Sequence, residues 1–368
     1  MSSPAWPDVL GLALSERGQR PDVRARLLRI HIDLFVSAPA RDDEAIRTFE
    51  ALALGFLPLI DPAQTVEVAE RLIGCPDTPD TILEYLCRRG GDAKRIVIER
   101  APRLPRPVIA HCLASESDAL LLAARPDLDR WAQEALLALH DLRIDCALAS
   151  SQNFMPSDPV LIELVRRGRD QAVLAKVLLT RADLTLADEA ALYLHADAER
   201  QDDIRHRIEA SAMRRNRSPS YRATRDDIEI LLVLAREGNV AQLGELLARI
   251  IGLEGQPDWR FLRQDRHELL ALALTAADVP SDDAVRILLT IHPIIAHSAR
   301  TVLHLSRVIR TVPRPTADML VEAIVGGTRR LEPPGHHIPV MDPSGASPYG
   351  TAGAVEQRRA GDRQLRVG

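Results

Sequence analysis

The sequence predicts an all-α protein, an α-solenoid of stacked antiparallel helix pairs that is HEAT-like. Four aspartates, at 92, 118, 141 and 170, each open an apolar run, in steps of 26, 23 and 29 residues. A pair of helices of ~8–12 residues with two short turns needs about this length. One pair cannot bury its own apolar stripes, so neighbouring pairs must stack.

Composition supports the same fold class. Apolar residues make up 46% of the chain, but aromatic residues only 3%. The core must then consist of Leu, Ala, Val and Ile, which suits packed helices better than a β-sandwich.

The chain before the repeats contains four expected helices, at about 8–17, 22–37, 42–57 and 62–73. The first is short and ends at Gly18. In the second, four apolar residues fall on one face at 4, 3, 4 spacing, the pattern of an amphipathic helix. They are Val23, Leu27, Ile30 and Leu34.

The repeats carry two start signals per unit. Between the aspartate runs lie further apolar segments, at 79–89, 105–114, 129–139 and 157–167. In the first two units Pro79 aligns with Pro105 and Asp92 aligns with Asp118. A proline loses no hydrogen bond at a first helical position, and an aspartate before a helix accepts from free N–H groups. Asp doublets at 42–43, 202–203, 226–227 and 282–283 are explained as helix N-caps in the same way.

The predicted domains are a helical-repeat array over 1–213, with its core repeats at 75–200, and a C-terminal helical region over 226–327. An Arg- and Ser-rich segment, 214–225, separates them and reads as an exposed linker. The array closes with an apolar run at 185–196 and a polar helix at about 201–214. Later helices are expected at about 265–277, 282–291, 294–310 and 316–325. From 328 to 368 Pro and Gly are dense and apolar periodicity vanishes, which predicts a disordered tail.

Motifs of enzymes and metal sites are missing from the sequence. It has no GxSxG elbow, no phosphate-binding glycine loop and no HExxH. His297 and His304 are seven residues apart, which is not the close spacing of zinc ligands. The four cysteines lack paired CxxC spacing and are expected to be free thiols. We therefore predict a protein that is not an enzyme, with no catalytic, cofactor-binding or metal residues and no cofactor.

The basic segment between 205 and 225 is the most informative local feature. The net charge of the chain is −5, which gives no global attraction to nucleic acid. The segment could be a solvated linker, a site for an acidic protein partner, or a phosphate-binding surface. Tyr221 is its only aromatic residue, so base stacking would be poor. The candidate partner-binding residues are Arg205, Arg207, Arg214, Arg215, Arg217, Arg222 and Arg225.

The segment VEVAERLIGCPDTPDTILEYLCRRGGDAKRIVIERAPRLPRPVIAHCLASESDALLLAARPDL, residues 66–128, resembles a bacterial family, mostly alphaproteobacterial, called domain of unknown function 2336. That family alternates a helix beginning near Pro with one beginning at Asp. The likeness extends over roughly 22–310. It implies a helical, HEAT-like, cytosolic protein and brings no activity or catalytic residues. This chain has Arg-Gly-Gly-Asp92 where the family has a small apolar residue before Asp.

These observations lead to two functional hypotheses. The first is a non-enzymatic helical-repeat scaffold, possibly regulatory in role, that binds a protein or peptide on a concave surface. The alternative is a HEAT-like protein that binds nucleic acid through an Arg-rich surface. No basic region followed by a long apolar run opens the sequence, and no apolar run reaches ~18 residues. We therefore expect a cytoplasmic protein without a membrane segment; the oligomeric state stays open.

Overall fold

The computed structural model describes residues 21–151, 154, 158–214, 221–255 and 257–329. Within them the chain is helical apart from two strands of two residues each, which confirms the all-α prediction. The described residues belong to one compact unit, Met1–Arg329. The expected helix at 8–17 and residues 330–368 of the expected tail lie outside the described part.

The first part of the chain forms short helices that follow one another closely. They are α2 (Pro21–Ser37), α3 (Asp43–Phe56), η1 (Leu57–Leu59), α4 (Pro62–Leu72), α5 (Asp80–Arg89), α6 (Gly91–Arg100), α7 (Arg106–Leu113), α8 (Glu116–Ala123), α9 (Arg130–Leu137), α10 (Leu142–Ser150), α11 (Pro159–Gly168) and α12 (Ala172–Leu179). Each helix predicted at 22–37, 42–57, 62–73, 79–89, 105–114, 129–139 and 157–167 is present.

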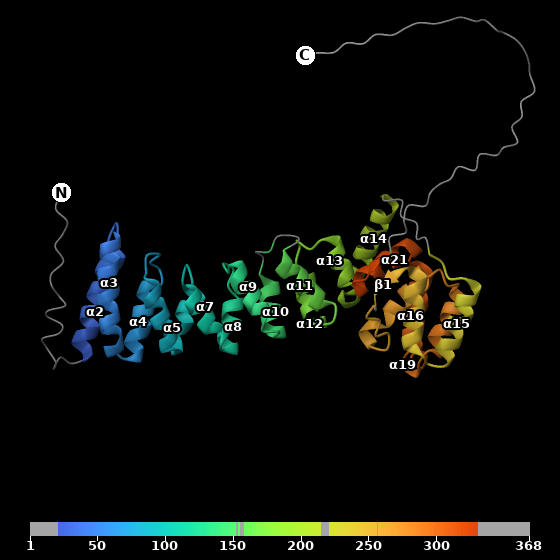
Figure 1. Cartoon of the computed structure of the whole chain (residues 1–368), viewed down its shortest axis with the longest axis horizontal. Coiled ribbons are helices and arrows are strands. Elements are labelled where there is room, and N and C mark those ends of the chain that lie inside the picture. Colours follow the sequence, from blue (N-terminus) through green and yellow to red (C-terminus); the bar gives the residue numbers. More distant parts are fainter. Residues whose placement is uncertain (1–20, 152–153, 155–157, 215–220, 256, 330–368) are drawn as a thin grey trace, which may run out of the picture. The chain divides into compact units, whose positions relative to one another are not determined.

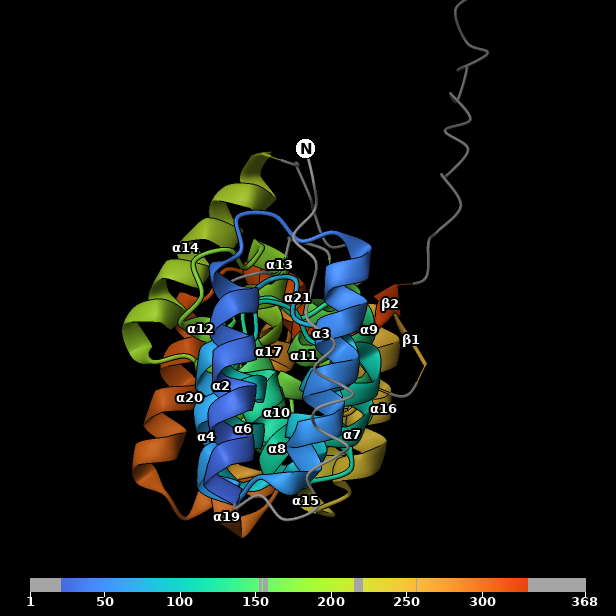
Figure 2. The same ribbon diagram turned by 90° about the vertical axis from the view of Figure 1, so that its left-hand side faces the viewer.

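These helices lie in two rows. Helices α2, α4, α6, α8, α10 and α12 contact one another in succession, and so do α3, α5, α7, α9, α11 and the following α13 (Leu186–Ala191). The two rows run through Figure 1, and Figure 2 looks along them, with α2 and α3 nearest the viewer. We call the rows even and odd after the numbers of their helices. From α5 onward, each helix of the odd row packs on the next helix of the even row, as α5 does on α6 and α11 on α12.

The second part has a different packing. Its elements are η2 (Tyr193–His195), α14 (Ala198–Arg214), α15 (Arg225–Arg236), α16 (Val240–Ile251), β1 (Leu253–Glu254), η3 (Gln264–Arg266), α17 (His267–Ala276), α18 (Ser281–Thr290), α19 (Pro293–Ala296), α20 (Ala299–Thr311), α21 (Arg314–Val325) and β2 (Thr328–Arg329). The apolar α17 is buried between α20 and α21, while α13 and α14 pack on α21. Strand β1 pairs antiparallel with β2, so the first two residues of the predicted tail belong to the fold.

The buried apolar side chains form two clusters. One runs from Leu28 to Leu192 along the two rows, and the other runs from Ala190 to Ile324. The division falls at α13, whose residues contribute to both. The predicted linker at 214–225 and the domains on either side of it stay a prediction.

Of the four repeat aspartates that were predicted to be helix N-caps, one accepts a capping hydrogen bond. Asp141 accepts from the backbone N of Arg143 at 2.7 Å. Asp92 and Asp118 lie inside the first turns of their helices, and Asp170 precedes the N-cap residue of α12. Asp118 is only 8% exposed and pairs with Lys94 of the preceding unit. Ion pairs between helices therefore explain Asp118, and also Asp170, as described below.

The Asp doublets were also predicted to be N-caps, and only some of them are. Asp42 caps α3, and Asp227 closes a capping box with Thr224 at the start of α15. The prediction for 202–203 is wrong, because α14 begins earlier, at Ala198. Asp197 supplies the acceptor there, for the backbone N of Arg200 at 2.8 Å. The doublet at 282–283 lies in the first turn of α18 without accepting a cap hydrogen bond.

The single helix predicted over 294–310 is wrong as well. The chain breaks it into α19 and α20 at His297–Ser298. Ser298 accepts from the backbone N of Thr301 at 3.2 Å and so begins a new helix. The buried residues of α20 are then Leu305, Val308 and Ile309. Among the described residues, no helix combines the length and apolar character needed to cross a membrane.

Candidate functional site

A buried arginine ties neighbouring units of the rows together. Arg125, in the turn after α8, is 8% exposed. Its guanidinium donates to the carbonyls of Ile98 and Ala101 at 2.6 Å each, and its Nη2 pairs with Asp127 at 2.5 Å. It thus satisfies free carbonyls at the end of α6, which have no partner inside their own helix.

A second buried arginine, 56 residues later in the chain, makes the same kind of contacts. Arg181 is 8% exposed, donates to the carbonyl of Ala149 at 2.8 Å and pairs with Asp183 at 2.6 Å. The two sites share the sequence pattern Arg-x-Asp-Leu, at 125–128 and 181–184. These arginines are bound to the fold, and their charge is not available to a partner.

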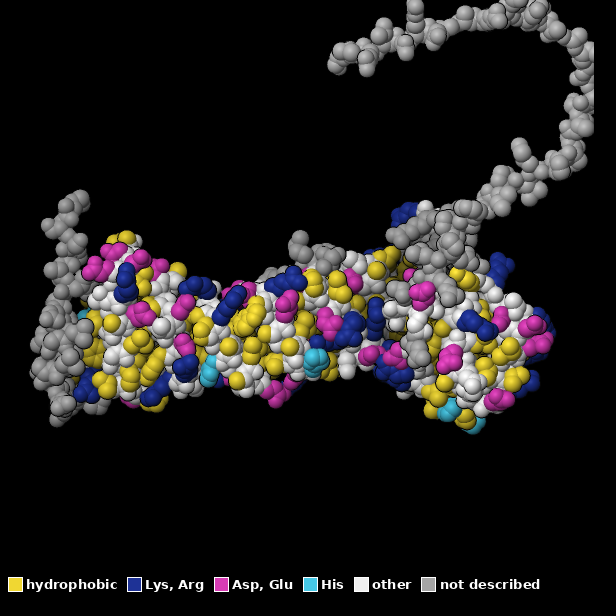
Figure 3. Space-filling view, viewed as in Figure 1, with side chains coloured by type: hydrophobic (Ala, Val, Ile, Leu, Met, Phe, Trp, Pro, Cys, Tyr) yellow, Lys and Arg dark blue, Asp and Glu magenta, His cyan; other side chains and the backbone are white. Residues whose placement is uncertain are grey.

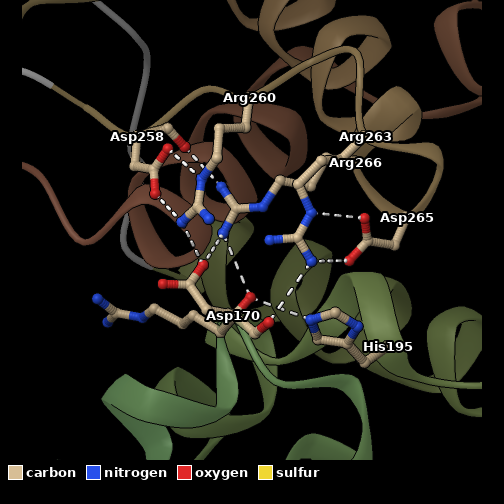
Figure 4. Close-up of polar contacts among 8 residues, drawn as sticks. Asp170, His195, Asp258, Arg260, Arg263, Asp265 and Arg266 are labelled. Carbon is tan, nitrogen blue, oxygen red and sulfur yellow. Dashed lines mark hydrogen bonds and ion pairs between the residues drawn. The ribbon is translucent and has the colours of Figure 1, made fainter.

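A network of ion pairs joins the end of α11 to the segment before α17 (Figure 4). Arg266 is 2% exposed and donates to Asp170 Oδ1 at 2.7 Å and to the carbonyl of Asp258 at 2.5 Å. Arg260 donates to the same Asp170 oxygen at 2.6 Å. Arg263 pairs with Asp265 at 2.7 Å. Burial lowers the pKa of Arg266, and the carboxylates of Asp170 and Asp258 oppose this by favouring its charge.

His195 is hydrogen-bonded into this network and also lines a groove at the protein surface. Its Nε2 donates to the carbonyl of Arg169 at 3.0 Å, and Arg266 donates to the same carbonyl at 3.2 Å. His195 is 8% exposed and lies at the base of a groove. The groove therefore has a wall that is fixed by several hydrogen bonds.

The groove between α12 and α14 has a volume of about 830 Å³. It is lined by Lys176, Leu179, Thr180, His195, Ala196, Asp197, Glu199, Arg200 and Asp203. The lining thus combines side chains of both charge signs with the apolar side chains of Leu179 and Ala196. We refer to these nine residues as the α12–α14 groove.

Some charged side chains of the α12–α14 groove are held in ion pairs within the residues that the structure describes, and others are not. Arg200 pairs with Glu189, whose side chain is 4% exposed, and is thereby held in place. Lys176 and Glu199 are exposed and form no ion pair within the described part of the chain. The groove lining therefore includes a cation on α12 and an anion on α14 that are not held by an ion pair among the described residues.

The predicted partner-binding arginines are dispersed over two elements. Arg205 pairs with Asp202, and Arg207 with Glu189, all but Glu189 on α14. Further along, Arg222 pairs with Asp278 and Arg225 with Glu229, both at 3.3 Å. Arg214 is exposed at the end of α14, while 215 and 217 lie outside the described residues. Four of the five described arginines thus have a carboxylate beside them.

Charges of both signs occur together on the face of the molecule that Figure 3 shows. Acidic and basic side chains are interspersed there along the rows. Many charged side chains of the described residues form pairs within one helix or between neighbouring helices, such as Arg95 with Glu99 and Arg103 with Asp80. Such a surface offers many local contacts but no extended positive field.

A second polar cluster lies on the other side of η2. The hydroxyl of Tyr193, fully buried, donates to Glu268 Oε1 at 2.7 Å. The other oxygen of Glu268 faces Nε2 of His304 at 3.4 Å. The carboxylate of Glu268 raises the pKa of His304, and burial raises the pKa of Tyr193. Tyr193 therefore keeps its proton and serves as a donor.

Within the described part of the chain, no group of three His, Cys, Asp or Glu side chains is placed to hold a metal ion. His297 and His304 lie on either side of Ser298, at different elements. The four cysteines are free, with Sγ of Cys87 and Cys112 3.9 Å apart in neighbouring units.

The sequence did not single out the residues that line the α12–α14 groove. Lys176 was visible only as one of two lysines, and His195 only as the end of an apolar run. They meet because η2 packs on α12 and leads into α14, which is a consequence of tertiary packing. Comparisons of the chain with protein-family models, with curated proteins and with solved structures gave no match.

Proposed function

We propose that this protein is a non-enzymatic α-solenoid scaffold of HEAT-like helix pairs that binds a protein or peptide partner. The α12–α14 groove carries the proposal. It is large enough for several residues of an extended peptide, and pockets of ~300–1,000 Å³ are the usual size for specific ligands.

The two rows of helices support the solenoid part of the proposal. Each helix of a row contacts its row neighbours and the helix of its own unit. Repeat proteins built this way are held by nearest-neighbour contacts and present extended surfaces to partners. The buried arginines at 125 and 181 fix successive units to one another, which would give such a surface a defined shape.

The chemistry of the groove favours a peptide with charges of both signs. Lys176 would pair with an acidic side chain and Glu199 with a basic one, while Leu179 would contact an apolar residue between them. A mixed lining of this kind selects partners through complementary charge and rejects uniformly charged ones.

Nucleic-acid binding by an Arg-rich surface is the alternative. Arginines that already pair with carboxylates contribute less to phosphate binding, because the acid must be displaced or repelled. Four of the five described arginines between 205 and 225 have such a partner. Arg214 is the described member that is exposed without one. The charge pattern therefore favours the peptide hypothesis.

The test begins with a selection of peptide-displaying phage on the immobilised full chain. Selected peptides are then titrated by calorimetry against the wild type and against Lys176→Glu and Leu179→Asp. We expect the Kd to rise at least tenfold for both variants. Arg130→Glu, an exposed charge reversal on α9 with 65% of the side chain accessible, is the matched control and should leave the Kd unchanged.

Two results would count against the proposal. One is a selection that yields no peptide above background, and the other is a peptide whose affinity ignores both groove variants. An electrophoretic shift of DNA or RNA at low salt, abolished by neutralising Arg214, Arg215 and Arg217, would favour the alternative. We further propose a cytoplasmic location and a relation to domain of unknown function 2336, both on sequence grounds.

A further inference from the structure

Helix α2 is the first described helix of the even row. In the later units the odd helix comes first and the even helix follows it: α5 then α6, α7 then α8, α9 then α10, α11 then α12. Helix α3, which follows α2 in the sequence, packs on α2 and also contacts α5 of the next unit. Within the described residues, which start at 21, α2 has no preceding partner of its own unit.

The face of α2 that such a partner would cover is apolar and exposed. Val23, Ile30 and Leu34 are 40%, 49% and 53% exposed. The buried side chains of the same helix are Leu28 and Ile32, joined by Phe35 in the core cluster. The stripe that the sequence singles out at 23, 27, 30 and 34 is therefore the outer face, and a second stripe packs inside.

A helix with two apolar faces is unusual at the end of a repeat array. Terminal repeats normally carry a polar outer face, because an apolar one would be left in water. Single exposed apolar residues need no explanation, but three at helical spacing, with the half-buried Leu27 between them, form a continuous strip. The strip on α2 thus indicates that another element covers it.

The segment directly before α2 has the composition of that element. Its sequence from 8 to 17 is DVLGLALSER, with Leu10 and Leu14 one helical turn apart. Three residues, Gly18 to Arg20, separate it from the start of α2. Short connections of this kind join antiparallel helices in bundles. In the later units the corresponding gap is comparably short, such as the two residues between α7 and α8.

We propose that residues 8–17 dock as a helix against Val23, Leu27, Ile30 and Leu34 and thereby complete the first unit of the array. The occupant is a segment of this chain, since the tether places it within reach and the unit pattern calls for a helix there. A second copy of the chain would have to displace a segment that is covalently held beside the strip.

Hydrogen exchange of the full chain, followed by mass spectrometry, tests this docking. We expect amides at 8–17 to exchange at least tenfold more slowly than the same sequence as a free peptide. Leu14→Asp should abolish that protection and accelerate exchange at 23–34 at least tenfold. Ser15→Asp adds the same charge at the next position, on the opposite face of the expected helix, and should change neither.

A change on α2 provides the reciprocal test. Ile30→Asp should release residues 8–17 to the exchange rate of the free peptide while α5 to α12 keep their protection. Light scattering should give the monomer mass for the wild type and for both variants. The proposal is overturned if 8–17 is unprotected in the wild type. It is equally overturned if the wild type is a dimer that Ile30→Asp converts to a monomer.

Discussion

Nη2 of Arg266 donates to Oδ1 of Asp170 at 2.7 Å, joining two residues 96 positions apart. Arg266 is 2% exposed, while the Asp170 side chain is 44% exposed. The pair connects the turn between α11 and α12 to the end of η3, directly before α17, the most buried helix of the second cluster. A buried guanidinium that loses its carboxylate is left uncompensated, which costs more than the pair contributes when intact.

The first prediction follows from that asymmetry. Asp170→Ala should lower the free energy of unfolding by about 3 kcal/mol, because Arg266 would keep its charge in a buried place without this partner. Urea denaturation followed by circular dichroism gives the change. Asp80→Ala, which removes the acid of an exposed pair with Arg103, should cost less than ~1 kcal/mol. Equal losses for the two variants would contradict the role assigned to the Asp170 pair.

A second prediction concerns the arginine that ties the units together. Arg125→Lys should cost about 2 kcal/mol, although the charge is kept, because a single ammonium cannot reach both carbonyls and Asp127 in the geometry of the guanidinium fork. The control is Arg103→Lys, at a side chain that is 72% exposed, which should leave the stability nearly unchanged. If Arg125→Lys is as stable as the wild type, the carbonyl contacts are not needed for the fold.

The sequence predicted helices well because their signals are local. Spacing of apolar residues placed the helices of both rows within a few residues of their ends, as at 62–73 against Pro62–Leu72. The starts were less accurate, since Asp118 and Asp170 look like caps in sequence but bind Lys94 and Arg266 in space. A cap and an ion pair use the same residue, and only the position of the partner distinguishes them.

The site was less predictable than the fold. The strip at 23–34 was visible as an apolar face, but periodicity does not say which of two faces is inside. The α12–α14 groove depends on the packing of η2 against α12 and on the turn into α14, which together place His195 and Glu199 in one groove with Lys176. The arginines of 205–225 stood out by composition, yet their carboxylate partners, such as Asp278, come from distant segments. The number of arginines in this segment of the sequence therefore overstated the unpaired positive charge on the surface.

A third prediction concerns the exposed histidine beside Glu268. His304 should titrate above its ordinary pKa of 6.5, because the carboxylate of Glu268 favours the imidazolium. A raised folded-state pKa gives stability that is present below the unfolded pKa and lost as pH rises through the folded one. NMR titration of the imidazole measures the value in the wild type and in Glu268→Gln.

The Glu268→Gln variant should bring the pKa of His304 down toward the ordinary value. Tyr193→Phe, which removes the hydroxyl donating to the other oxygen of Glu268, is the control for a general disturbance of the cluster. It should keep the raised pKa, because the carboxylate remains. A pKa that is the same in the wild type and in Glu268→Gln would rule out the carboxylate as its cause.

The last prediction is a pH dependence of stability at the end of the rows. Arg166 and Arg167 both donate to Glu163, at 2.7 and 2.9 Å, and lower its pKa from 4.5 to about 2. The unfolded chain therefore binds a proton at Glu163 that the folded chain does not, throughout that interval. The resulting stability is present above the unfolded pKa and is lost as pH falls toward 2.

Glu163→Gln should accordingly be about 1 kcal/mol less stable than the wild type at neutral pH, a modest figure because Arg166 is 63% exposed and solvent screens the pair. Denaturation curves should show that the difference in free energy of unfolding between the two proteins shrinks as the pH falls from 4.5 toward 2. At that pH both proteins carry a neutral side chain at 163. Glu134→Gln, in an exposed pair on α9, tests whether any lost carboxylate has this effect. A gap that stays constant down to the lowest pH would mean that packing around Glu163, rather than its ionisation, stabilises the chain.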